Sequence, residues 1–96
     1  MSLELAERVY RKHGRSIFGA VLTKHFFIRF FERSNDLEKL GKVLRKINKT
    51  LPEMVFDLTL SGNTKVFVIE GYKVPCILQM NEGIMCPEII VKTLYK

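Results

Sequence analysis

The spacing of apolar residues changes near Glu53, and this change constrains the fold more than any other feature of the sequence. Before Glu53, apolar residues recur three and four positions apart, which is the spacing of an amphipathic helix. After Glu53 they occur in short runs between turn residues, as in β-strands. No linker, repeat or low-complexity stretch separates the two halves. We therefore predict one α+β domain over residues 1–96, with a shared core.

Three helices are predicted in the first half, over residues 2–12, 24–33 and from 37 to a point before Pro52. Thr23 has the position of an N-cap for the second helix, and Asn35 and Glu38 have the spacing of a capping box for the third. The third helix should end before Pro52, because a residue that precedes proline disfavours helical backbone. The short apolar segment Ser16–Leu22 is predicted to be extended.

Four strands are predicted in the second half, over residues 54–60, 65–70, 74–80 and about 88–95. Turns are expected between them, at residues 61–64, 71–73 and 81–83. Connections this short join strands that run antiparallel. The predicted fold is therefore α+β, with N-terminal helices packed on one face of a four-stranded antiparallel sheet.

The charge of the chain points to an anionic partner. Sixteen Lys and Arg residues against ten Asp and Glu give a formal net charge of +6. Nucleic acid, an acidic protein and an anionic surface all fit that charge. No apolar run reaches the roughly 18 residues of a membrane span, and charges near the start replace the apolar core of a signal peptide. We therefore expect a cytoplasmic protein outside the membrane, and the oligomeric state stays open.

Cysteine and histidine usage predicts neither a metal nor a cofactor. The chain has two cysteines, Cys76 and Cys86, and two histidines, His13 and His25. These four residues lack the close paired spacing of zinc ligands. Two cysteines also make no disulfide framework, which agrees with a reducing cytoplasm.

The residues that carry the most chemical information are His25, Arg29 and Arg33. Steps of four place them on one face of the second predicted helix. The opposite face consists of phenylalanines that are expected in the core, namely Phe26, Phe27, Phe30 and Phe31. Histidine transfers protons near neutral pH, and arginine matches phosphate with a planar fork. This set suits attack of an RNA 2′-hydroxyl on the adjacent phosphate, without a metal. The alternative is a solvated face on which Glu32 pairs with a neighbouring arginine.

The segment from Thr23 to Arg33 fits the pattern T/S-x-H-x-x-x-R-x-x-x-R. In this pattern and in its order of elements the chain resembles the small RelE-like domains, near the BrnT toxins, of the barnase–EndoU–colicin–RelE group. The resemblance spans roughly residues 17–95. Phe26 departs from it, because the family usually has Ala or another small residue there, and the first helix is an addition.

The resemblance has direct consequences for function. It implies that His25, Arg29 and Arg33 are catalytic. It also implies that RNA is cleaved to a 2′,3′-cyclic phosphate and a 5′-hydroxyl, and that an antitoxin masks the site.

Other residues are candidates for RNA binding through phosphate attraction or base stacking. They are Arg8, Arg11, Lys12, Arg15, Lys24, Lys73, Lys92 and Tyr95. The alternatives to RNA binding are structural. The N-terminal cluster, which comprises Arg8, Arg11, Lys12, His13 and Arg15, and the basic face over residues 39–49 are then only solvated surfaces, and Tyr95 only packs at the edge of the sheet.

The sequence thus predicts a metal-independent endoribonuclease of the toxin type, with RNA and an antitoxin or other acidic protein as partners. The alternative is a non-catalytic basic module of a mobile element that binds nucleic acid or protein. The two differ in whether His25 and both arginines line a cleft beside the sheet or face bulk water.

Overall fold

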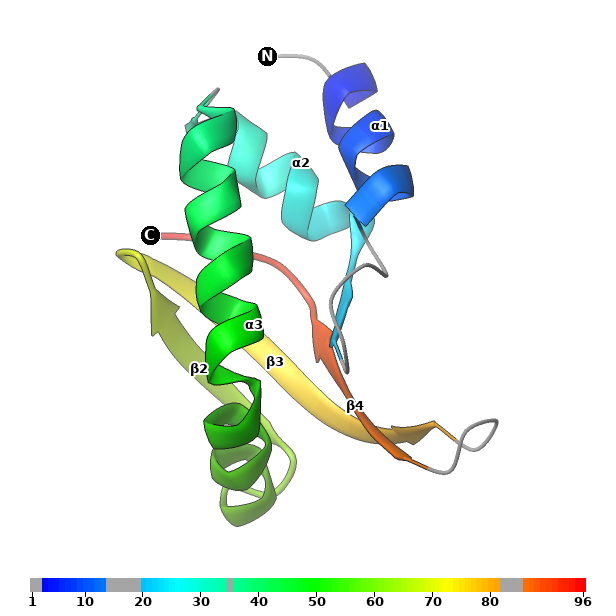
Figure 1. Cartoon of the computed structure of the whole chain (residues 1–96), viewed down its shortest axis with the longest axis vertical. Helices are drawn as coiled ribbons and strands as arrows, with labels where there is room; N and C mark the ends of the chain where they lie inside the picture. Colours follow the sequence, from blue (N-terminus) through cyan, green and yellow to red (C-terminus); the bar gives the residue numbers. More distant parts are fainter. Residues whose placement is uncertain (1–2, 14–19, 35, 82–85) are drawn as a thin grey trace.

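Three helices and four strands make up the computed structural model, which describes residues 3–13, 20–34, 36–81 and 86–96 (Figure 1). In chain order they are α1 (Leu3–His13), β1 (Ala20–Leu22), α2 (Lys24–Arg33), α3 (Leu37–Leu60), β2 (Thr64–Ile69), β3 (Tyr72–Asn81) and β4 (Cys86–Val91). The predicted α+β class and the first two helices are confirmed. Of the predicted extended segment, Ala20–Leu22 is strand β1, and the remainder lies outside the described residues.

The four strands form one mixed sheet in the order β1-β4-β3-β2. The pairs β2–β3 and β3–β4 are antiparallel, as predicted, but β1 pairs parallel to β4, with Val21 opposite Ile90. The prediction of a purely antiparallel sheet is therefore wrong. Only strands joined by a short turn have to be antiparallel, whereas β1 is separated from β4 by most of the chain, which is long enough for a crossover.

The largest error of the sequence prediction concerns the end of α3. The helix was expected to stop before Pro52, with a strand over residues 54–60, but it continues through Pro52 to Leu60. Proline removes one helical hydrogen bond, and its ring crowds the carbonyl group of Asn48. Met54 and Leu58 are buried on the same side as Ile47, and this burial offsets the local cost.

The caps of α2 and α3 show why these helices begin where they do. The Thr23 side chain accepts a hydrogen bond from Phe26 N at 3.2 Å, as predicted for an N-cap. Asp36 caps α3 by accepting from Glu38 N and Lys39 N at 3.0 and 3.1 Å. Asn35, the predicted cap, lies outside the described residues.

The boundaries of all three C-terminal strands differ from the prediction, and β2 runs from Thr64 to Ile69 rather than over residues 65–70. Tyr72 belongs to β3 rather than to a turn, because Glu70 and Gly71 alone form the connection, both with positive φ. Asn81 ends β3, and the rest of the predicted third turn lies outside the described residues. β4 ends at Val91, and beyond it Tyr95 makes only an isolated bridge to Lys73.

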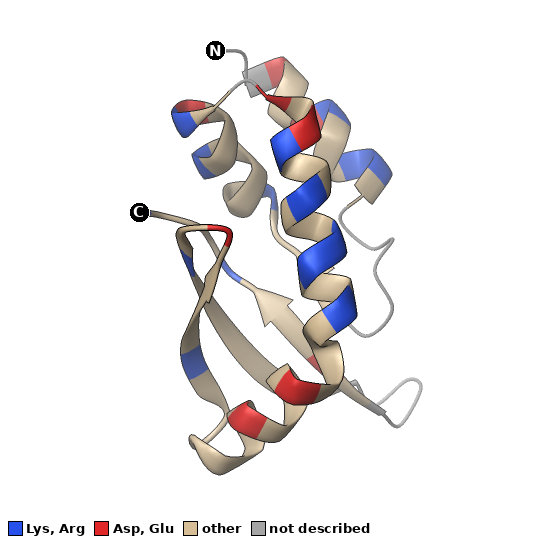
Figure 2. Cartoon of the chain, turned by 60° about the vertical axis from the view of Figure 1, so that its left-hand side comes forward, with Lys and Arg blue, Asp and Glu red and all other residues tan. Residues whose placement is uncertain are grey.

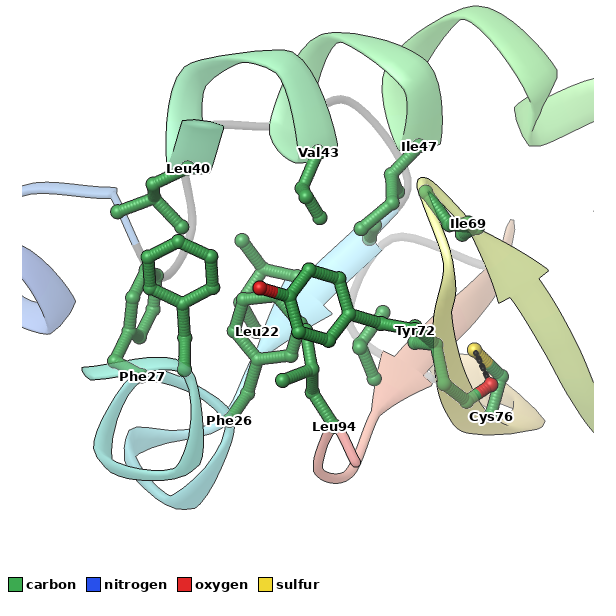
Figure 3. Close-up of a cluster of buried hydrophobic side chains, with 14 of the residues drawn as sticks. Leu22, Phe26, Phe27, Leu40, Val43, Ile47, Ile69, Tyr72, Cys76 and Leu94 are labelled. Carbon is green, nitrogen blue, oxygen red and sulfur yellow. Dashed lines mark hydrogen bonds between the residues drawn. The ribbon is translucent and has the colours of Figure 1, made fainter. Parts of the chain in front are cut away.

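One buried cluster joins side chains of the helices and the sheet (Figure 3). The four phenylalanines of α2 are fully buried or nearly so, as predicted. The rings of Phe30 and Tyr72 lie 5.9 Å apart, and α3 contacts both β2 and β3. Among the described residues, no helix has the length and apolarity to cross a membrane.

Candidate active site

The polar face of α2 is held in place by its buried phenylalanines and by its first residue. Phe26 and Phe27 form an edge-to-face pair with ring centroids 5.2 Å apart, and Phe30 and Phe31 form another at 5.4 Å. The Thr23 hydroxyl donates a hydrogen bond to the Lys92 carbonyl, and the Thr23 N–H donates one to the Val91 carbonyl. The start of α2 is thus fixed to the end of β4, which sets the direction of the polar face.

His25 and Arg29 contact each other directly on this face. Arg29 Nε donates a hydrogen bond to His25 Nε2 at 3.2 Å. An unprotonated imidazole nitrogen can accept such a bond. The predicted spacing therefore does bring a proton-transfer group into contact with a cation.

Arg29 also binds a carboxylate on the same face. Its Nη1 lies 2.8 Å from Glu32 Oε1, which confirms the alternative prediction that Glu32 pairs with a neighbouring arginine. Neither contact uses Nη2, which is left to bind an oxygen of another molecule. Both side chains are about two-fifths exposed, and ion pairs of that kind contribute about 0–1 kcal/mol to stability.

The three predicted catalytic residues lie on an open surface. His25 and Arg33 are exposed, and Arg29 is half-buried. Arg33 lies one helical turn beyond Arg29, with its guanidinium within reach of solvent. This arrangement brings His25 and Arg29 together, but the three side chains face solvent, as the non-catalytic alternative predicts.

A carboxylate that the sequence analysis missed connects α1 with α2. Glu7 Oε1 lies 3.0 Å from Arg11 Nη2 and 3.6 Å from Lys24 Nζ, so two predicted RNA contacts share one acid. The Glu7–Arg11 pair has the i,i+4 spacing that predicts such contacts. No spacing along the chain signals the Glu7–Lys24 pair, because it joins two helices.

Two other members of the N-terminal cluster, Arg8 and Lys12, line a groove between α1 and α3. The groove has a volume of about 370 Å³. Its remaining lining is mostly apolar and consists of Val9, His13, Leu37, Leu40, Gly41 and Leu44. Arg15 lies outside the described residues.

The predicted RNA contacts of the sheet come together near the C-terminus. Lys73 and Tyr95 exchange two backbone hydrogen bonds, and Lys73 Nζ lies 6.0 Å from the centre of the Tyr95 ring. Lys92, three residues before Tyr95, has its carbonyl bound by Thr23 at the start of α2. The segment from Lys92 to Tyr95 therefore connects the candidate active site with the Lys73–Tyr95 pair.

Sequence reasoning missed the contacts of two further cations with Tyr72, the neighbour of Lys73 in β3. Lys39 Nζ and Lys96 Nζ lie 5.8 and 5.7 Å from the centre of the Tyr72 ring. Lys39 belongs to α3, whereas Lys96 follows the last strand. Nothing along the sequence relates them, because the contact exists only once α3 and the C-terminal segment meet at Tyr72.

The charge of α3 is divided along its length (Figure 2). After Glu38 in the first turn, residues 39–49 expose Lys42, Arg45, Lys46 and Lys49, and residues 50–60 carry Glu53 and Asp57. The predicted basic face of residues 39–49 therefore exists, but it ends where an acidic segment begins.

Comparisons with known proteins add no family to this picture. Within the described ranges, no three His, Cys, Asp or Glu side chains form a cluster that could hold a metal ion. Comparison of the chain with protein-family models, with curated proteins and with solved structures found no match. A function for this chain therefore has to be inferred from α2 and its surroundings.

Proposed function

We propose that this chain is a metal-independent endoribonuclease of the toxin type, which acts on RNA in the cytoplasm. One observation carries the proposal: His25 and Arg29 contact each other on an exposed helix face. The pair combines a proton-transfer group with a phosphate-binding guanidinium, and Arg33 follows one turn later. The resemblance to RelE-like domains points to the same three residues.

In the proposed reaction, the 2′-oxygen of one nucleotide attacks the adjacent phosphorus, and the bond from phosphorus to the 5′-oxygen of the next nucleotide breaks. His25 takes the 2′-hydroxyl proton at Nε2, and the resulting imidazolium returns a proton to the leaving 5′-oxygen. Arg29 and Arg33 neutralise the charge on the non-bridging phosphate oxygens. The products are a 2′,3′-cyclic phosphate and a 5′-hydroxyl.

The contacts of Arg29 add a step to this reaction. In the free chain Nε2 of His25 is occupied by Arg29. An arriving phosphate therefore has to draw Arg29 away from His25 before His25 can act as a base. Binding of the RNA phosphate and release of His25 to act as a general base are thus one event.

The Lys73–Tyr95 pair extends the proposed RNA-binding surface. Tyr95 stacks on a base while Lys73 holds a phosphate, and Lys92 lies between this pair and α2. Arg8 and Lys12 attract the remainder of the strand without regard to its sequence. An acidic antitoxin would compete with RNA for Arg29 and Arg33.

A second candidate function is RNA binding without cleavage. It is favoured by the exposure of His25 and Arg33 and by the hold of Glu32 on Arg29. The same cations would then bind phosphates, and His25 would transfer no proton.

Analysis of RNA ends distinguishes the two functions. The purified chain is incubated with mixed RNA, and separately with ribosomes, in EDTA. We expect fragments with cyclic phosphate and 5′-hydroxyl ends. Cleavage that requires a divalent ion would contradict the proposed mechanism. Tight RNA binding with intact RNA under every condition would establish the second candidate instead.

A further inference from the structure

The edge of the sheet at β2 carries unpaired backbone groups. In the order β1-β4-β3-β2, β2 is a terminal strand of the described sheet. Leu78 N donates to Asn63 O at 2.8 Å, so Asn63 faces β3 with its backbone groups. In an antiparallel pair, successive residues direct their N–H and C=O groups alternately toward the partner strand and away from it. The backbone groups of Thr64, Val66 and Val68 therefore point to the outer edge. Val66 and Val68 also expose 46% and 73% of their surface. An exposed apolar edge of this kind is a template for another strand.

The helix beside this edge has a charge pattern of its own. A groove of about 150 Å³ lies between α3 and β2, and Phe67 is part of its lining. The α3 side of the groove begins with Lys46 and continues to Glu53 and Asp57, and Asp57 pairs with Lys65 of β2 at 3.4 Å. Lys46 therefore makes one end of the groove positive, and Glu53 makes the other end negative.

We propose that a second copy of this chain adds its own β2 to this edge, antiparallel, and so joins two sheets into one. A two-fold axis at Phe67 pairs Val66 with Val68 of the partner subunit, and Val68 with Val66 of the partner subunit. Each pair uses the outward backbone groups and covers two exposed valines. Phe67 meets its own counterpart at a position without backbone hydrogen bonds, where side chains come closest.

The charges of α3 identify the occupant as a second copy. A two-fold axis perpendicular to the sheet reverses the direction of the partner's α3. Lys46 and Lys49 then lie along Glu53 of the other copy, while Asp57 stays paired with Lys65 of its own chain. A uniformly acidic or basic partner would be repelled by one half of this helix, whereas an antiparallel copy is attracted by both.

Sedimentation equilibrium tests the strand pairing. We expect the wild type to approach twice its monomer mass of 11.2 kDa as its concentration rises to the millimolar range. Val68→Lys should raise the dimer dissociation constant at least about tenfold, because each dimer contains the change twice. Met80→Lys is the matched control, since Met80 is also exposed on the sheet but lies beyond the part of β3 that pairs with β2. It should leave the dissociation constant unchanged.

Charge reversal tests the helix pairing. One variant combines Lys46→Glu with Lys49→Glu, and the other is Glu53→Lys, which leaves the pair of Lys65 and Asp57 within the chain intact. Each should stay monomeric alone, because like charges then face each other, and an equimolar mixture should form a dimer. A monomeric wild type at every concentration would overturn the proposal. So would equal effects of Val68→Lys and Met80→Lys, or a mixture that stays monomeric.

Discussion

At the scale of single residues, Arg29 determines the state of the candidate active site. It binds His25 through Nε and Glu32 through Nη1, so the carboxylate holds the guanidinium where it blocks the imidazole. A ligand that engages Nη1 of Arg29 has to compete with Glu32. Glu32 is therefore predicted to restrain RNA binding.

Glu32→Gln should raise RNA affinity about 2- to 10-fold at low salt, because Arg29 loses its ionic partner and becomes available to phosphate. The measurement is RNA affinity at several salt concentrations. Glu38→Gln is the matched control, since it removes the same charge from an exposed site on α3. Equal gains in the two variants would mean that only net charge matters.

Cys76 provides a second test at this scale. The thiol is buried, and its S–H donates to the Val74 carbonyl at 3.5 Å. Burial disfavours the thiolate and raises the pKa of Cys76 from 9.0 to about 12. Because the folded thiol has the higher pKa, its contribution to stability is complete below pH 9 and is lost as the pH rises through about 12.

Urea denaturation at a series of pH values measures this contribution. Between pH 9 and 12 the wild type should lose stability faster than Cys76→Ala, by up to about 1.4 kcal/mol per pH unit. Parallel pH profiles of the two proteins would show that the thiol ionises as readily in the folded state as in the unfolded one.

The sequence predicted contacts within a helix better than contacts between elements. The spacing of His25, Arg29 and Glu32 was enough to predict a shared face and an ion pair. The contacts of Glu7 with Lys24 and of Lys39 with Tyr72 depend on how elements meet, and no local pattern encodes that.

At the scale of elements, α3 shows how burial overrides a local signal. Met54, Val55 and Phe56 are a continuous apolar run after a proline, which is typical of a strand. Met54 and Leu58, however, also lie 7 and 11 residues after Ile47, on the same helix face. Sequence alone does not choose between these two interpretations, but packing against β2 and β3 does.

Pro52→Ala should stabilise the protein by about 1–3 kcal/mol, because alanine restores the missing N–H and removes the ring from the carbonyl of Asn48. Pro52 is exposed, so the substitution opens no cavity. The measurement is urea denaturation, with Lys49→Ala as a control that should change stability by only a few tenths of a kcal/mol. A loss of stability in Pro52→Ala would contradict the account of α3.

The direction of β1 was beyond sequence reasoning for a different reason. Its three residues carry no signal of direction, and its partner β4 lies at the other end of the chain. The hairpin of β2 and β3 was predicted from two short apolar runs around Gly71, although its turn consists of Glu70 and Gly71 rather than residues 71–73.

At the scale of the whole molecule, the net charge of +6 is unevenly distributed. Arg8 and Lys12 line the groove between α1 and α3, and Arg11 is engaged by Glu7. The basic half of α3 is assigned to a second copy of the chain. RNA is therefore expected to bind through α1, α2 and the Lys73–Tyr95 pair.

The salt dependence of RNA affinity tests this distribution. Arg8→Gln combined with Lys12→Gln should flatten the slope of log affinity against log salt by about one for each lost phosphate contact. Lys42→Gln combined with Lys49→Gln removes the same charge from α3 and should leave the slope nearly unchanged. A larger effect of the α3 variant would place the RNA on α3.

The central claim is that His25 transfers a proton during RNA cleavage, and single-turnover cleavage of His25→Ala in EDTA tests it most directly. We expect the cleavage rate to fall about 10²- to 10⁴-fold, as is typical for loss of a general acid or base. RNA affinity should change little, because the other cations remain. Asn48→Ala, at an exposed position of α3, should cleave at the wild-type rate. Wild-type cleavage by His25→Ala would contradict the account.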